Sequence, residues 1–233
     1  MRWVRQGLCG LAVLLVSAAA AAGAQPEGRA YPALAPLQQY RSASTAEEIA
    51  LARSAAPAAI SEKAEILALG AGGYQTAAKG ANGFVCLVER SWGTGFDDPQ
   101  FWNSKVRSPM CFNASAARSV LPAYLERTRS VLAGVSRARM LARAKAQAAR
   151  PGGGAPQAGA MCFMMSKQGY LADGVGHAHP HLMFFMPRTA AGAWGANLPG
   201  SPVAADQGAP EAVTTFFVTV TRWSDGTSAM DMK

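Results

Sequence analysis

The chain has 233 residues, of which 50% are hydrophobic and 15% charged, and its 22 basic residues outnumber the 14 acidic ones. This length suffices for one substantial domain and is too short for two large ones. Beyond the N-terminal region, no stretch has the roughly 18 uninterrupted apolar residues of a membrane helix. The composition therefore excludes a protein built from membrane-spanning helices.

The N-terminal region has the three parts of a secretory signal peptide. Two arginines precede the apolar stretch 11–16, and small residues ending at Ala24 follow it. This order of basic, apolar and small residues is typical of an export signal that is removed. We predict a signal peptide over residues 1–24 and a mature chain that begins near Gln25. The protein is then expected in the periplasm or outside the cell.

The first element expected in the mature chain is a helix. Thr45 and Glu48 have the spacing of a capping box, in which a hydroxyl and a carboxylate satisfy the first free amides of a helix. Pro57 cannot continue a helix, so we expect the helix to end before this residue.

Three short segments rich in β-favouring residues follow. They cover residues 65–69, 74–79 and 84–92, and the turns between them, GAGG and GANG, contain glycine. Short glycine turns between such segments are typical of hairpins. The pattern predicts three strands in an antiparallel meander.

The middle of the chain is predicted to be helical. Asn113 or Ser115 can cap a helix that has Pro122 in its first turns. Gly134 is the expected end of this helix, and Ser136 is the expected start of a second one.

These helices carry an uneven charge. Eight basic residues fall within 33 positions, and only Glu126 opposes them. Such a surplus can bind an anionic envelope surface, or it can be a solvated helix face without a partner. The lack of aromatic residues for base stacking and the exported location argue against a nucleic acid. The basic residues are Arg118, Arg127, Arg129, Arg137, Arg139, Arg143, Lys145 and Arg150.

Residues 151–159, PGGGAPQAG, are expected to form a flexible linker inside the domain. Beyond it, residues 160–166, 181–187 and 213–220 are rich in β-favouring residues and predict three more strands. Strands, helices and strands in this order, without a strict βαβ alternation, favour an α+β fold. We expect residues 25–233 to form a single α+β domain with a mainly antiparallel sheet of about six strands and two to three helices.

The mature chain contains three cysteines, Cys86, Cys111 and Cys162. In an oxidising compartment an odd number predicts one disulfide and one free thiol, and the spacing leaves all three pairings open. Cys111 also lies just before a predicted helix start, where the helix dipole can lower a thiol pKa. A cysteine nucleophile at this position is therefore an alternative interpretation.

All three histidines, His177, His179 and His181, fall in the segment GVGHAHPHLMFF. In an extended chain, residues two apart point to the same side about 6.5–7 Å apart, so two of the three imidazoles can reach one ion. Asp173, a cysteine or a methionine can supply a further ligand. The pattern predicts a zinc or copper site, which in a hydrolytic enzyme would activate water with Asp173 as base.

The alternative is that these histidines are structural and bond to neighbouring backbone groups in a non-catalytic envelope protein that binds a partner. Methionines cluster near them, which suggests Cu(I). In a strand, however, only Met183 shares a face with His179 and His181, so the other methionines are expected to fill the core.

The run His177-Ala178-His179-Pro180-His181-Leu182-Met183 resembles the histidine-triad motif. The resemblance implies a phosphoester transferase or hydrolase in which His179 is the nucleophile and His177 and His181 assist. It covers seven residues, and Pro180 departs from the usual apolar residue.

A second resemblance rests on GFVCLVERSW, CFNASAARSVLPAYL, MCFMMSKQGYL and HPHLMFFMPR. Together these segments resemble an uncharacterised family of exported bacterial proteins. The resemblance covers most of the mature chain and implies no activity.

Overall fold

The structure is a computed structural model that describes residues 31–176 and 178–230, so the predicted signal peptide and His177 lie outside the described residues. One mixed sheet of eight strands forms the centre of this part, in the order β2-β1-β3-β4-β5-β6-β8-β7. The strands are β1 (Glu65–Gly70), β2 (Gly73–Ala78), β3 (Val85–Glu89), β4 (Ser108–Phe112), β5 (Met161–Met164), β6 (His181–Pro187), β7 (Val203–Asp206) and β8 (Val213–Thr219).

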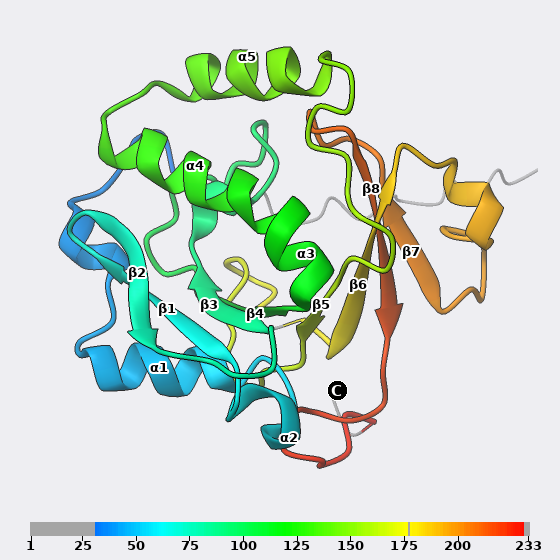
Figure 1. Cartoon of the computed structure of the whole chain (residues 1–233), viewed down its shortest axis with the longest axis horizontal. Helices are drawn as coiled ribbons and strands as arrows, with labels where there is room; N and C mark the ends of the chain where they lie inside the picture. The colour runs from blue at the N-terminus through cyan, green and yellow to red at the C-terminus, as the bar shows by residue number, and fades with distance from the viewer. Residues whose placement is uncertain (1–30, 177, 231–233) are drawn as a thin grey trace, which may run out of the picture.

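Helices cover both faces of this sheet (Figure 1). In that view α1 and α2 lie below the sheet, α3 and α4 lie above it, and α5 lies beyond α4 as the outermost layer. None of the helices in residues 31–176 and 178–230 has both the length and the apolar character needed to cross a bilayer. They are α1 (Thr45–Arg53), α2 (Ala58–Ser61), α3 (Ala114–Ser119), α4 (Leu121–Leu132) and α5 (Arg137–Ala148), with the 3₁₀ turns η1 (Leu37–Tyr40), η2 (Ser91–Gly93) and η3 (Ala191–Trp194).

The predicted α+β class is confirmed, whereas the expected element numbers were too low. All six expected strands are present, and β4 and β7 are additional. Residues 31–176 and 178–230 contain five helices instead of the expected two to three, because the chain breaks between α3 and α4 and forms the short α2. Antiparallel pairing dominates the sheet, with one parallel pair between β1 and β3.

Strand β4 lies in the middle of the sheet although it contains Pro109, which cannot donate a ladder hydrogen bond. The amide of Asn113 donates to Met161 O on the β5 side at 3.0 Å. Backbone direction alternates every residue, so the nitrogen of Pro109 also faces the β5 side. At the level of Pro109 the chain after β5 has already separated from β4. The amide of Met165, the residue after β5, donates to Ala55 O at 2.9 Å instead. Pro109 therefore occupies a position where no donor is needed.

The predicted antiparallel meander of the first three strands was wrong. β1 and β2 form a hairpin, but β3 pairs with β1 in parallel, on the side away from β2. The segment after β2 must therefore cross the start of β1, where the amide of Ala81 donates to Lys63 O at 2.8 Å. Gly80 makes this crossing possible, since a Cβ at this position would overlap the backbone of Glu65.

Local capping motifs begin three of the helices. Asn113 and Ser136 cap α3 and α5, as predicted. The first cap is shifted by one residue from the prediction: Ser44 rather than Thr45 accepts from the amide of Glu47, and the Glu47 carboxylate accepts from the amide of Ala43. This shift leaves the Glu48 side chain free to turn into the interior.

The core has one layer on each face of the sheet. On the face toward α3 and α4, apolar strand residues pack with Ala116, Val120 and Leu121. On the opposite face, alanines of the α1 region, including Ala52 and Ala55, pack on the other side of the strands. Small residues let α1 approach the sheet closely.

Strand β7 forms one edge of the sheet, and a side chain covers its open edge. Asn197 Nδ2 donates to Ala205 O at 3.0 Å, and its Oδ1 accepts from the amide of Ala205 at 2.9 Å. The carboxamide thus imitates a neighbouring strand. Asn197 adopts a φ of 61°, which asparagine tolerates better than most residues.

Candidate functional site

The histidine segment leads into β6 rather than lying within it. His181 is the first residue of the strand, whereas His179 precedes it and is exposed. The ring nitrogen Nδ1 of His181 lies 2.8 Å from His179 O, and the ring centroid lies 5.8 Å from that of Phe217. Pro180, between them, accepts a hydrogen bond from the amide of Val220 at 2.9 Å. His177 lies outside the described residues.

Asp173 is held by three donors, of which Tyr31 and Lys105 are distant in sequence and Tyr170 is a near neighbour. Tyr31 Oη donates to Oδ2 at 2.5 Å, Lys105 Nζ lies 3.0 Å from Oδ1, and Tyr170 Oη also donates to Oδ1. The two phenols and the ammonium hold the pKa of the Asp173 carboxyl well below its usual range. This carboxylate fastens the start of the described chain to the segment before the histidines.

The predicted ligand set of His177, His179, His181 and Asp173 is thus only partly located. Within the residues that the structure describes, no three histidine, cysteine, aspartate or glutamate side chains form a group suited to a metal ion. The predicted zinc or copper site stays a prediction, because His177 is outside the description. The same holds for the resemblance to the histidine triad.

The imidazole of His181 has a defined chemical state. A backbone carbonyl can only accept, so Nδ1 carries the proton and Nε2 keeps its lone pair. Desolvation lowers the pKa of His181, which favours the neutral ring. Met164, Ser166 and Leu171 line a small hollow of about 20 Å³ together with His181.

The three cysteines of the described residues form one disulfide and one free thiol, as expected. Cys86 and Cys111 are bonded across β3 and β4, where they are direct partners in the strand register. The alternative interpretation of Cys111 as a nucleophile is therefore wrong. Cys162 is free and completely buried on the other face of the sheet, and burial raises its thiol pKa well above the usual value.

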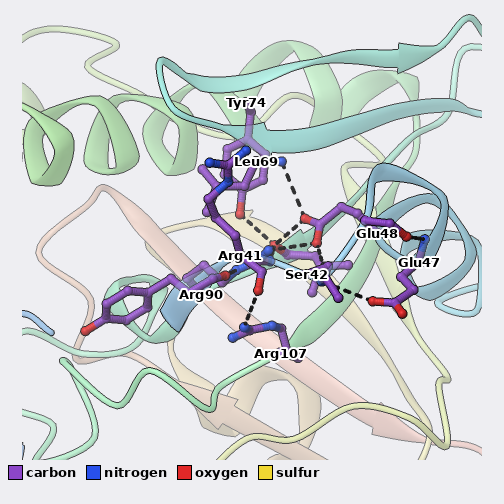
Figure 2. Close-up of polar contacts among 12 residues, drawn as sticks. Arg41, Ser42, Glu47, Glu48, Leu69, Tyr74, Arg90 and Arg107 are labelled. Carbon is purple, nitrogen blue, oxygen red and sulfur yellow. Dashed lines mark hydrogen bonds and ion pairs between the residues drawn. The ribbon is translucent and has the colours of Figure 1, made fainter. Parts of the chain in front are cut away.

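A buried ion pair, which sequence reasoning missed, joins α1 to the residue that follows β3 (Figure 2). Arg90 follows β3, and its Nη2 lies 2.8 Å from both carboxylate oxygens of Glu48. The two side chains are 0% and 4% exposed. Ser42 Oγ also donates to Glu48, and the remaining guanidinium nitrogens donate to Tyr40 O and Val88 O.

Because each charged atom of this pair has a partner, the cluster joins the N-terminal segment to the sheet rather than offering a reactive group. Arg107 lies nearby and also fixes the N-terminal segment, because it donates hydrogen bonds to Gln39 O and Arg41 O (Figure 2). Burial and the neighbouring Arg90 lower the pKa of Arg107 to about 10. A charged residue directly after a buried strand, as Arg90 is after β3, is the one sequence signal for such a pair.

Glu89 lies at the end of β3 and has no such partner. It is partly buried beside Gly93, where a Cβ would overlap its carboxylate. Desolvation raises the pKa of Glu89 to about 8, although Arg127 and Arg90 oppose the shift. The carboxyl is therefore largely protonated near neutral pH.

Helix α5 and the residues just after it carry more than half of the basic residues of the window. Met140 is buried, and Leu141 and Ala144 pack beside it against the core cluster around Trp92. Arg139, Arg143, Lys145 and Arg150 are exposed. In the described chain, neither Arg139 nor Lys145 has a side-chain hydrogen bond or an ion pair with any residue.

The other basic residues of the window are engaged. Arg127 binds Glu211 at 2.6 Å and lies over the Phe96 ring, Arg129 binds Glu126 at 2.9 Å, and Arg118 donates to a glutamine in the segment 151–159. Arg139 and Lys145, which have no side-chain partner in the part of the chain that the structure describes, thus both lie on α5. Comparisons of the chain with protein-family models, with curated proteins and with solved structures found no match.

Proposed function

We propose that this is an exported, non-catalytic protein that binds the anionic surface of a lipid bilayer through the exposed basic residues of α5. The observation that carries the proposal is the unpaired charge of Arg139 and Lys145, flanked by the exposed Arg143 and Arg150. Anionic lipid headgroups supply the opposite charge that these side chains lack within the described protein.

Most of the charge in α5 does not stabilise the helix itself, and only Lys145, in the last turn, is placed favourably for the helix dipole. Arg137 and Arg139 occupy its first turn, where the positive end of the helix dipole disfavours cations by about 0.3–1 kcal/mol each. The helix contains no acidic residue that could form a pair three or four positions away. An external anionic partner therefore accounts for a charge pattern that the folded protein does not need.

The surroundings of these residues favour a lipid surface over a nucleic acid. Ala138, Ala142 and Ala146, the exposed residues between them, offer no ring on which a base could stack. The larger apolar residues, Met140 and Leu141, face the protein, so contact with the bilayer is electrostatic and involves no insertion. Because α5 is the outermost element on its side of the molecule, it can approach a flat surface along its length (Figure 1).

Vesicle binding tests this proposal. The purified protein is sedimented with vesicles of phosphatidylcholine alone or with phosphatidylglycerol added, at low and at high salt. Each basic residue near an anionic surface contributes about 1 kcal/mol. The double variant Arg139→Ala/Lys145→Ala should therefore bind the mixed vesicles roughly 30-fold more weakly than the wild type.

Lys63→Ala/Lys79→Ala is the matched control, because it removes the same net charge from two exposed lysines near α2 and the end of β2, away from α5. This control should bind nearly as the wild type does. Equal losses in both double variants, or wild-type binding that ignores salt and lipid charge, would contradict the proposal. Binding to DNA but not to vesicles would also reject it.

A further inference from the structure

Four sulfur- or nitrogen-bearing side chains occupy adjoining positions on β5 and β6. Cys162 is the register partner of Met183, and Met164 is the partner of His181. Direct partners in an antiparallel pair project to the same face, with Cβ atoms about 4.5–5.5 Å apart. Residues two apart along a strand share that face at about 7 Å. The four residues therefore form the corners of a rectangle on one face of the sheet.

This face is the one covered by α3 and α4, and burial falls along it. Cys162 and Met183 are 0% and 5% exposed and belong to the core layer. Met164 packs at the border of that layer, and His181 is likewise only partly buried. The border pair can be reached from solvent, whereas the pair beneath it is sealed.

The orientation of His181 suits it to bind a metal ion. Its Nδ1–H donates to His179 O, which fixes the ring and directs the lone pair of Nε2 away from the backbone. Metal-binding histidines commonly use one nitrogen for the ion and the other for such a hydrogen bond.

The hollow lined by Met164 and His181 has a volume of about 20 Å³. This is close to the room that one water molecule occupies, about 10–15 Å³, so a single ion can be accommodated with little rearrangement. The rest of the wall offers no carboxylate and consists of Pro109, Ser166, Gly169, Leu171 and Ala178. The nearest predicted acidic ligand, Asp173, is already held by Tyr31, Tyr170 and Lys105.

We propose that Met164 and His181 bind one Cu(I) ion, through the thioether sulfur and Nε2. Met183 and Cys162 form the next pair on the same face and place two more sulfur atoms behind this site. Thioether and thiol ligands select Cu(I) over zinc, calcium or magnesium. The site depends on the β5–β6 register and not on the basic helix α5. This proposal therefore goes beyond membrane binding, and a test of one does not decide the other.

Anaerobic titration with Cu(I), against a chromophoric chelator and with ascorbate as reductant, tests the site on protein without a histidine tag. The wild type should bind one equivalent. Met164→Leu keeps the side-chain volume but removes the sulfur, and it should weaken binding at least tenfold, as should His181→Ala. Met161→Leu is the matched control, because Met161 is the partner of Phe184 and faces the other side of β5.

X-ray absorption of the copper-loaded protein identifies the ligands directly. We expect sulfur together with one imidazole nitrogen around the copper. A first shell of nitrogen alone, or a loss of affinity in His179→Ala that exceeds the loss in Met164→Leu, would overturn the proposal and assign the metal to the histidine segment. No bound copper would also overturn it. Thermal unfolding without copper checks that each variant folds.

Discussion

The two halves of the sheet are built differently. Strands β1 to β4 lie between α1 on one face and α3 and α4 on the other, and this half holds both the buried Arg90–Glu48 pair and the disulfide. Strands β5 to β8 hold the proposed copper ligands, and short segments help to cover them: Trp194 of η3 stacks on Phe216 with ring centroids 4.4 Å apart. The buried ion pair and the disulfide thus both lie in the first half, whereas the proposed copper ligands lie in the second.

If this comparison is right, the largest loss of stability should come from the buried pair. Arg90→Ala leaves the Glu48 carboxylate in the interior without its cation, and it should lower the free energy of unfolding by about 4 kcal/mol. Equilibrium urea denaturation measures the change. Arg129→Ala, which breaks the exposed pair with Glu126, should cost less than about 1 kcal/mol. Similar losses in the two variants would contradict the comparison.

The disulfide is expected to have the next largest effect. Its cysteines are 25 residues apart in sequence, and closing such a loop lowers the free energy of the folded state relative to the unfolded chain by about 3 kcal/mol. Cys86→Ala/Cys111→Ala should therefore unfold at clearly lower urea concentration. In the wild type, iodoacetamide should label Cys162 only after unfolding, because the thiol is buried. Labelling of the native protein would show that this core layer opens.

Glu89 should make the first half sensitive to pH. Its pKa is about 8 in the folded protein, against 4.5 ordinarily, so between these values the folded state binds more protons than the unfolded state. Stability should then fall as pH rises from 4.5 to 8. Glu89→Gln removes this dependence and should gain about 2 kcal/mol over the wild type at pH 8, since the site is partly exposed. Urea denaturation at pH 5 and pH 8 measures this, and parallel curves would refute it.

The smallest effect is expected in the second half. Trp194→Ala removes the ring that stacks on Phe216 and should cost about 1 kcal/mol, because the indole is 38% exposed. Leu198→Ala, in the same segment and 59% exposed, should change stability little. A loss for Trp194→Ala as large as that for Arg90→Ala would show that stability is spread evenly over the sheet.

The sequence predicted the elements better than their connections. Strands rich in β-branched and aromatic residues, such as β3 and β8, are apparent from composition alone. β4 was missed because Pro109 argues against a central strand, and only the departure of the chain after β5 makes it acceptable there. The parallel pairing of β1 and β3 was missed because the glycines between the strands suggested hairpins, whereas Gly80 serves a crossing.

The candidate site shows the same limit. The histidine segment is visible in the sequence, but Asp173 is taken by Tyr31, a contact between residues 142 positions apart that no local pattern indicates. The pairing of Met164 with His181 depends on the register of β5 with β6. The long segment between these two strands gives no local pattern from which that register could be predicted. The sequence indicated only that Met183 shares a face with His181, two residues away in the same strand, whereas the neighbour across the strands is Met164. Long-range register, not residue type, was the missing information.

The carboxamide of Asn197 has a consequence for copies of the protein that come close together. By satisfying both backbone groups of Ala205, it gives the sheet a closed end on the β7 side. Protein gathered at high density on a bilayer would bring such ends into frequent collision, and an open strand there would recruit a second chain into a growing fibre. A single asparagine in a left-handed conformation can thus keep neighbouring copies separate.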